Sequence, residues 1–403
     1  MRTSIIHGRL YLDAIPSSKH LWQVEDDGAV ITEDDRIVEV APTRQVLQSG
    51  NSLGHVIDVE GRAVVPGFID CHTHLPFAGW RSDEYVARLM GTSYESISRR
   101  KGGIARSSEQ WAEASDDQIM EFTEQLAREA LAWGTTVLEM KSGYGLTVAQ
   151  EQRALAIIQA LAARLPQPLV ATGLFLHAVP PHSTDAQWLS QVKTELLPQS
   201  LHAGLISAVD AFIERTAFSP QQVLSVFTDL SGHVPIRLHT NQFSQMGGID
   251  LAVQLRARSV EHVECLSPKE MDLLATHGIA AVVMPGAAFY RSAHAYAPAR
   301  AIVDKGIRLA LATDLNPGSS PVGNLPTVMA LAVNLMDITP EEALAGVTRE
   351  AAYVLGLEGH YGSIRPGFLG NLVVLDCPDI ADIPYRIGHN PVKTVIIHGQ
   401  PVL

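Results

Sequence analysis

The chain has 403 residues, of which 46% are hydrophobic and 18% charged, and its formal net charge at pH 7 is −13. These values are typical of a globular protein with a sizeable core, and they exclude disordered and collagen-like chains. The acidic balance, without any run of Lys or Arg, argues against nucleic-acid binding, which depends on clustered cations.

The cysteines and the start of the chain predict a cellular location. Only Cys71, Cys265 and Cys377 are present, and the first residues lack the apolar core of a signal peptide. No stretch approaches the roughly 18 uninterrupted apolar residues that a membrane-spanning helix needs. We therefore expect a reduced, cytoplasmic protein with no membrane role.

The first elements in chain order are short strands. Alternating apolar and polar residues, separated by turns, predict strands within Thr3–Asp13, Ala29–Val40 and Val56–Glu60, and the pattern returns in Gly362–Asp376 and Lys393–Leu403. Neither end alone is long enough for a stable sheet with its own core. We therefore predict one small β-sandwich-like domain built from both termini, residues 1–62 and 363–403.

Between these ends, short β-branched runs alternate with helical patterns, as in βα units around a parallel sheet. Ser115 is a good N-cap for a helix that ends at Gly134, and the stretch Val148–Leu165 repeats the helical pattern. Eight strands indicate an α/β fold, a closed (β/α)8 TIM barrel over residues 63–362. The predicted strands are Ala63–Asp70, Thr135–Met140, Leu169–Leu176, Val209–Ile213, Pro235–His239, Ser259–His262, Ile279–Met284 and Leu309–Asp314.

Two histidines, His72 and His74, follow the first predicted barrel strand. Side chains two residues apart on a strand point the same way, so both imidazoles can reach one metal ion. For an isolated His-X-His pair, ordinary hydrogen bonding in a loop would be an equally good interpretation. Further ligands at other strand ends decide between the two.

Such groups recur at the carboxyl ends of later strands: His177, His239, His262 and Asp314. In a (β/α)8 barrel these ends meet on one face, where catalytic groups lie. Imidazoles and a carboxylate suit zinc or iron, and a metal-bound water reaches a pKa near ~7. The pattern therefore predicts a metal-dependent hydrolase.

These residues resemble the amidohydrolase superfamily, whose members carry such ligands on the strands of a barrel. Members with two metals commonly have a bridging lysine at the end of the fourth strand. Here that strand reads Val209-Asp-Ala-Phe-Ile-Glu214, without lysine. The resemblance implies one metal ion per chain, zinc or iron.

Within that superfamily, longer segments resemble the imidazolonepropionases, which open the imidazolone ring in histidine degradation. The Lys-Ser-Gly-Tyr-Gly and Thr-Asp-Leu-Asn-Pro-Gly motifs are the most specific, and the matches span nearly the whole chain. The matching segments are Asp70-Cys-His-Thr-His74, Gly79-Trp-Arg81, Glu139-Met-Lys-Ser-Gly-Tyr-Gly145, His177-Ala-Val-Pro-Pro181, Pro285-Gly-Ala-Ala-Phe-Tyr290 and Ala312-Thr-Asp-Leu-Asn-Pro-Gly318.

The resemblance implies a role for each ligand position. The implied metal ligands are His72, His74, His239 and Asp314. His262 and Asp314 are the implied catalytic residues, since either could move the proton of the attacking water, and the sequence leaves open which one does.

The resemblance also implies a set of substrate contacts. Arg81 matches the contact to the substrate carboxylate, for which a guanidinium has the right geometry. Asn316-Pro-Gly318 is equally a turn signal. The implied substrate-binding residues are Arg81, Tyr94, Tyr144, His177, Gln242, Asn316, Gly318 and Ser319.

One segment departs from the usual family pattern. The chain reads His239-Thr-Asn-Gln242 where many members read His-Ala-Asp-Glu, although glutamine also occurs at the last position. A neutral amide can hydrogen-bond a substrate ring but cannot act as a general base, so Gln242 is assigned to binding.

The implied reaction is hydrolysis of the cyclic amide of 4-imidazolone-5-propanoate, a small anionic heterocycle, to N-formimidoyl-L-glutamate. We expect no organic cofactor, because the chain has no Walker-type or dinucleotide-binding glycine motif. One alternative is another mononuclear amidohydrolase, a cyclic amide hydrolase or an amino-heterocycle deaminase. A catalytically silent scaffold is another, although no expected ligand is missing. A homodimer is common for such barrels, but no residue indicates it.

Overall fold

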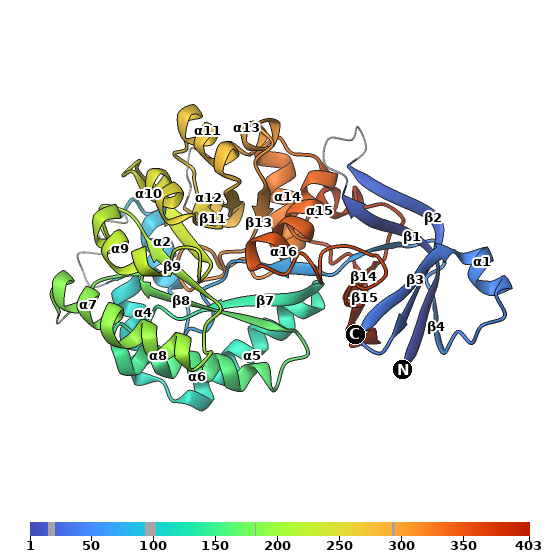
Figure 1. Cartoon of the computed structure of the whole chain (residues 1–403), viewed down its shortest axis with the longest axis horizontal. Coiled ribbons are helices and arrows are strands. Elements are labelled where there is room, and N and C mark those ends of the chain that lie inside the picture. The colour runs from blue at the N-terminus through green and yellow to red at the C-terminus, as the bar shows by residue number, and fades with distance from the viewer. Residues whose placement is uncertain (15–20, 93–101, 182, 292–294) are drawn as a thin grey trace.

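A computed structural model of the chain describes residues 1–14, 21–92, 102–181, 183–291 and 295–403. These residues form two sheets, a barrel surrounded by helices and a separate sheet that contains both ends of the chain (Figure 1). Among the described residues, no helix is long and apolar enough to cross a membrane.

The barrel sheet has eight parallel strands in chain order, which confirms the predicted (β/α)8 barrel. A bridge between Thr73 and Leu315 joins the first strand region to the last. Two backbone hydrogen bonds support this closure, from His74 N to Leu315 O (2.9 Å) and from Asp314 N to His72 O (3.0 Å). The strands are β6 (Phe68–Asp70), β7 (Thr135–Lys141), β8 (Leu169–Leu176), β9 (Ala208–Phe212), β10 (Ile236–Thr240), β11 (Ser259–His262), β12 (Ala280–Val283) and β13 (Leu309–Leu311).

The first predicted strand, Ala63–Asp70, is wrong as a single element. Its first half is β5 (Ala63–Pro66), which pairs with strands of the other sheet, and only β6 belongs to the barrel. The chain passes between the sheets at Gly67, where a Cβ atom would lie 2.2 Å from Thr136 Oγ1. The Thr136 side chain packs directly against the backbone there and leaves no room for a Cβ atom, so the position requires glycine.

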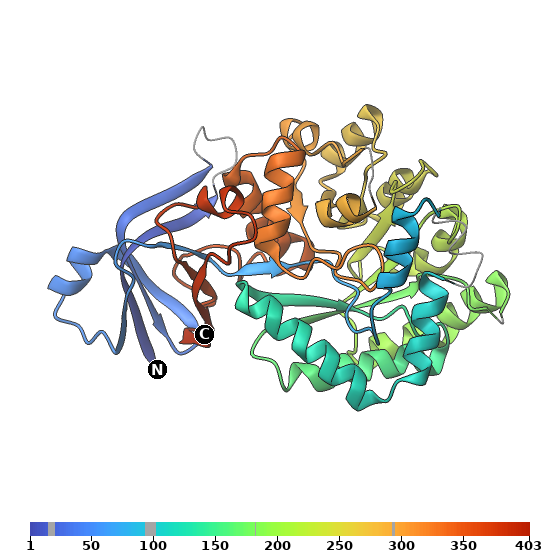
Figure 2. The ribbon, with the colours of Figure 1, turned by 180° about the vertical axis from the view of Figure 1, so that it is seen from behind.

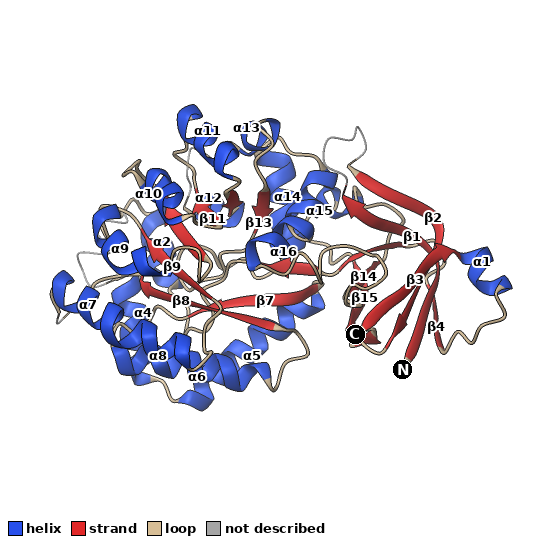
Figure 3. Ribbon diagram, in the orientation of Figure 1, coloured by secondary structure: helices blue, strands red, loops and turns tan. Residues whose placement is uncertain are grey.

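Helices lie around the barrel strands, as Figures 2 and 3 show from two sides. The predicted cap is confirmed, because Ser115 forms a capping box with Gln118 at the start of α5. The helix predicted over Val148–Leu165 ends earlier, at Ala162. From Ser82 onward, the described helices are α2 (Ser82–Leu89), α4 (Ile104–Glu113), α5 (Asp116–Ala132), α6 (Val148–Ala162), α7 (Asp185–Gln191), η1 (Val192–Leu196), α8 (Leu197–His202), α9 (Pro220–Phe227), η2 (Thr228–Leu230), α10 (Gly248–Leu255), α11 (Pro268–His277), α12 (Pro285–Tyr290), α13 (Ala299–Asp304), α14 (Leu325–Leu335), α15 (Pro340–Gly346), α16 (Arg349–Leu355) and α17 (Asp382–Tyr385).

The second sheet combines both ends of the chain, as predicted. Strand β14 pairs antiparallel with β5, so a C-terminal strand lies directly beside an N-terminal one. The N and C termini both lie at this sheet in Figure 1. The division into residues 1–62 with 363–403 and residues 63–362 stays a prediction. The sheet contains β1 (Arg2–Ala14), β2 (Trp22–Glu33), β3 (Arg36–Pro42), β4 (His55–Asp58), β5, β14 (Leu372–Leu375), β15 (Val392–Ile397) and β16 (Gln400–Pro401), and α1 (Thr43–Gln48) follows β3.

Candidate metal centre and active site

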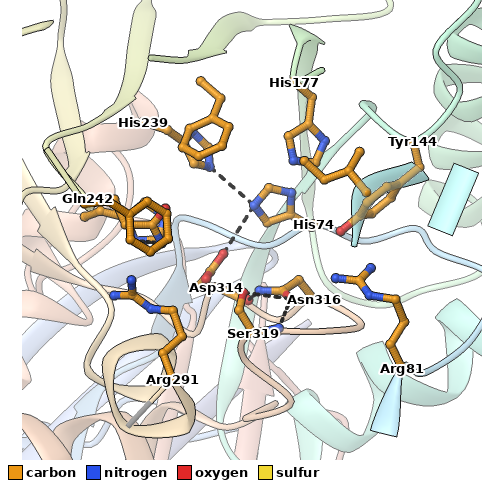
Figure 4. A pocket seen from close by; sticks show the side chains of 14 residues that line it. His74, Arg81, Tyr144, His177, His239, Gln242, Arg291, Asp314, Asn316 and Ser319 are labelled. Atoms are coloured by element: carbon orange, nitrogen blue, oxygen red, sulfur yellow. Dashed lines mark hydrogen bonds and ion pairs between the residues drawn. The ribbon is translucent and has the colours of Figure 1, made fainter. Parts of the chain in front are cut away.

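The carboxyl ends of the barrel strands bring the predicted histidines and Asp314 together. All six side chains are buried, and they come from segments far apart in the sequence. Figure 4 shows His74, His177, His239 and Asp314 around one pocket. The six are His72, His74, His177, His239, His262 and Asp314.

Three of these side chains, His72, His74 and Asp314, form a group whose ligand atoms all lie within 4.8 Å of one another, and His239 lies beside His74. Asp314 Oδ1 lies 3.2 Å from His74 Nε2 and 3.5 Å from His72 Nε2. The Nε2 atoms of His74 and His239 are 3.3 Å apart. Tetrahedral bonds of zinc length would place ligand atoms about 3.4 Å from one another. His72 Nε2 and Asp314 Oδ1 are also buried without a hydrogen-bond partner among the described residues.

The backbone at three strand ends is in the left-handed region, which is uncommon for residues other than glycine. The φ angle is 53° at Asn241, 78° at His262 and 52° at Asp314. Such conformations cost free energy and cluster at functional sites, where the surrounding fold maintains them. The last predicted strand, Leu309–Asp314, ends at Leu311 in the structure.

Burial and neighbouring charges set the protonation of these groups. Burial lowers the pKa of His239 to about 4, and it holds the pKa of His177 well below its usual value. For Asp314, burial opposes ionisation, but the neighbouring His72 and His74 outweigh it and keep its pKa well below the usual range. His239 and His177 are therefore neutral near pH 7, and Asp314 is a carboxylate.

Buried carboxylates lie behind two of the histidines. Asp210 lies 3.0 Å from His239 Nδ1, and Glu261 contacts His72 Nδ1. Burial and Lys141 lower the pKa of His72, but the charges of Glu261 and Asp314 raise it to about 9. The sequence analysis missed Asp210 and Glu261 as site residues. Their signal was an acidic residue within an otherwise apolar barrel strand.

The pocket extends from this centre to two arginines. Arg81 and Tyr144 lie on one side, and Gln242 and Arg291 lie on the other (Figure 4). The described residues that line it are His74, Arg81, Ile104, Tyr144, His177, Phe212, His239, Gln242, Phe243, His262, Arg291, Asp314, Asn316 and Ser319.

Arg81 is buried and held in place by its neighbours. Its Nε donates to Glu84 Oε2 (3.1 Å), and its Nη1 contacts Ser107 Oγ. Gly318 packs against the guanidinium, since a Cβ atom there would lie 1.9 Å from Arg81 Nη2. Gly318 is not among the pocket-lining residues given above.

The loop after β13 is shaped by Asn316. Its Oδ1 accepts hydrogen bonds from the backbone N–H groups of Gly318 (2.9 Å) and Ser319 (2.7 Å), and its Nδ2 donates to Asp314 O (2.6 Å). Asn316 and Ser319 therefore form a turn and also line the pocket, and their role in substrate binding stays a prediction.

The other predicted contacts lie at the pocket wall. His177 Nδ1 is 2.9 Å from Gly143 O, and the rings of Tyr144 and His177 are 5.3 Å apart. Gln242 Nε2 lies 3.2 Å from His262 Nδ1. Tyr94 lies outside the described residues.

Arg291 is a pocket residue that the sequence analysis missed. It follows directly after the matched segment that ends at Tyr290, and it pairs with Glu264 at 2.6 Å. Its guanidinium lies 4.8 Å from the ring centre of Phe243. Arg291 was missed because its charge alone does not distinguish it, in the sequence, from arginines on the protein surface.

Sequence comparison gives the family. The model of the amidohydrolase family matches residues 63–402. The curated imidazolonepropionase of Acinetobacter baumannii is 39% identical over 382 residues, which cover 94% of both chains. That of Pseudomonas savastanoi pv. phaseolicola is 37% identical over 381 residues, with the same coverage.

Solved structures share the fold at low identity. An adenosine deaminase from Xanthomonas campestris with bound zinc has a TM-score of 0.76 at 19% identity, covering 100% of this chain and 92% of the other. The 5-methylcytosine deaminase from Klebsiella pneumoniae liganded with 5-fluorocytosine has a TM-score of 0.75 at 18% identity, covering 100% and 97%. The family model and the full-length relatives together show that the chain belongs to the amidohydrolase family, as a hydrolase of carbon–nitrogen bonds within its imidazolonepropionase group.

Proposed function

We propose that the chain hydrolyses the cyclic amide bond of 4-imidazolone-5-propanoate, giving N-formimidoyl-L-glutamate. The observation that carries this proposal is that a buried arginine, Arg81, lines the same pocket as His74, His239 and Asp314. The substrate has a negatively charged propionate, which would pair with Arg81. Its ring carbonyl, where the reaction takes place, would lie beside the histidines and Asp314. The near full-length similarity to curated imidazolonepropionases supports the same substrate.

We assign one metal ion per chain to His72, His74, His239 and Asp314. The distances between their donor atoms support this assignment. When bound, such an ion polarises a carbonyl and brings the pKa of a bound water to about 7. Three imidazoles and one carboxylate suit zinc and iron alike.

Asp314 and His262 are the residues to which we assign proton transfer. Water adds to the ring carbonyl carbon, the bond from that carbon to the ring nitrogen breaks, and the nitrogen takes up a proton. Asp314 is ionised, and a carboxylate is the form that can accept the water's proton. His262 lines the same pocket and is close enough to share in the transfer.

We assign substrate binding to the remaining pocket walls. Arg81 would pair with the propionate through its guanidinium. Gly318 leaves room for this guanidinium because it has no Cβ atom. Tyr144 and His177 would contact the substrate on the side of Arg81. Asn316 and Ser319 would contact it from the loop after β13. Gln242, facing His262, would hydrogen-bond the ring and cannot serve as a base.

The proposal is tested by following the loss of imidazolonepropionate absorbance with wild-type enzyme and the Arg81→Ala variant. Loss of a charged hydrogen bond predicts a kcat/KM about 10- to 100-fold lower for the variant. Arg128→Ala is the matched control, since Arg128 lies on α5 and is 53% exposed. Wild-type enzyme that leaves imidazolonepropionate intact but deaminates an uncharged amino-heterocycle would show that the proposed substrate is wrong.

A further inference from the structure

A layer of buried, charged side chains lies directly beneath the proposed metal centre. It consists of five side chains that point into the barrel from four strands, and each is no more than 1% exposed as a side chain. The interior of a (β/α)8 barrel is usually filled by branched apolar residues, so this layer is unexpected. We call it the ion layer: Glu139 and Lys141 on β7, Asp210 on β9, Arg237 on β10 and Glu261 on β11.

Lys141 is the central cation of the ion layer. Its Nζ lies 2.6 Å from Glu139 Oε1, 3.2 Å from Asp210 Oδ2 and 3.9 Å from Glu261 Oε2. The other cation, Arg237, contacts a single carboxylate of the layer, Glu139, at 3.0 Å. Lys141 therefore joins all three carboxylates, and Arg237 does not.

Two of those carboxylates each reach a proposed metal ligand. Asp210 lies 3.0 Å from His239 Nδ1, and Glu261 contacts His72 Nδ1. An imidazole that donates its Nδ1–H to a carboxylate presents the lone pair of Nε2 on its other side. The Nε2 atoms of His72 and His239 are the ones directed at the centre.

The third carboxylate fixes the backbone between the paired histidines. Glu139 Oε2 accepts a hydrogen bond from the N–H of Thr73 at 3.0 Å, and Thr73 Oγ1 donates to the backbone oxygen of Glu139 at 2.7 Å. Thr73 stands between His72 and His74 in the sequence. His72 and His239 thus contact carboxylates of the ion layer directly. His74 is linked to the layer through its neighbour Thr73.

Without a cation between them, Asp210 and Glu261 would repel each other. Their oxygens and the facing nitrogens of His72 and His239 all lie within 4.8 Å of one another. Two carboxylates at that separation in a buried site favour rotation apart, which would withdraw a carboxylate from a ligand histidine.

We infer that Lys141 is a positioning residue for the metal centre: it holds Asp210 and Glu261 against His239 and His72, so that both imidazoles present Nε2 to the ion. The three carboxylates outnumber the two cations by one, so the layer also leaves a negative charge next to the bound cation. This inference rests on the proposed metal centre but not on the proposed substrate.

The test compares zinc binding by the full-length wild-type protein with binding by Lys141→Met and Arg237→Met. Zinc affinity and the rate of zinc loss to a chelator are measured on protein whose folding has been checked by its unfolding midpoint. Loss of a group that orients metal ligands predicts a zinc Kd about 10- to 100-fold higher for Lys141→Met, with faster zinc loss. Arg237→Met is the matched control, because it removes a cation from the same layer without touching Asp210 or Glu261.

A purely structural role for Lys141 would give a different result. Both variants would then lower the unfolding midpoint, and folded Lys141→Met would bind zinc as the wild type does, which would overturn the inference. If Lys141→Met does not fold, Glu261→Gln replaces it, since this change keeps the size of the side chain and removes the charge that Lys141 holds. A Kd for Glu261→Gln equal to that of the wild type would also overturn the inference. Wild-type protein that binds neither zinc nor iron would refute the metal centre itself, whatever the substrate.

Discussion

At the scale of single residues, the sequence predicted the candidate metal ligands because they occupy strand ends. A His-X-His pair and single His or Asp residues after apolar runs are visible without a structure. The buried side chains that contact these ligands were not predicted from the sequence. Lys141 and Glu139 lie in a matched motif, yet only the closed barrel shows that Lys141 also contacts Asp210 and Glu261.

Gly318 gives a test of how the pocket holds its arginine. In Gly318→Ala, the new Cβ atom would lie 1.9 Å from Arg81 Nη2, so the guanidinium has to move. If Arg81 binds the substrate carboxylate, kcat/KM for imidazolonepropionate falls about 10-fold or more, mainly through KM.

Gly323→Ala is the matched control for this substitution. It lies in the same loop, and its Cβ atom would meet Leu315 at an ordinary distance of 3.7 Å. The measurement compares kcat and KM of both variants with those of the wild type. Equal kcat/KM values for Gly318→Ala and wild type would show that the position of Arg81 does not limit substrate binding.

At the scale of elements, helices with strong caps were predicted well and strand boundaries less well. Ser115 starts α5 as expected, because a capping box is a local signal. The run Ala63–Asp70 is apolar throughout, and no local signal divides it between two sheets. Its division at Gly67 follows from pairing with β14, which lies about 300 residues later in the chain.

The start of α6 predicts a pH dependence of stability. Burial raises the pKa of Glu151 from 4.5 to about 7, even though its carboxyl group accepts a hydrogen bond from Leu146 N at 2.9 Å. Since the folded pKa is above the unfolded one, the folded state binds more protons between these values. The free energy of unfolding therefore falls as pH rises from about 4.5 to about 7.

Glu151→Gln removes this titration. Urea unfolding at pH 5 and pH 8 measures it, and between these two pH values the wild type loses on the order of 1 to 3 kcal/mol relative to the variant. Glu121→Gln, on the exposed side of α5, is the control and follows the wild type. A wild type and Glu151→Gln that change in parallel with pH would contradict this assignment.

At the scale of the whole molecule, the barrel was predictable because its parallel strands are buried on both faces and appear as apolar runs. The joining of both termini in one sheet was predictable because neither end could form a core alone. On the pocket wall opposite Arg81, only Gln242 was predicted from the sequence. Arg291 and Phe243 meet there only after the barrel closes, and their spacing in the sequence carries no regular pattern.

The central claim is that this barrel holds one metal ion on which hydrolysis of imidazolonepropionate depends. The most direct test is the metal content of the purified protein, measured together with the rate of imidazolonepropionate loss before chelation, after chelation and after zinc or iron is added back. We predict about one metal ion per chain and turnover that chelation removes and metal restores. Full turnover by metal-free protein, or a bound metal with no turnover of imidazolonepropionate, would contradict the account.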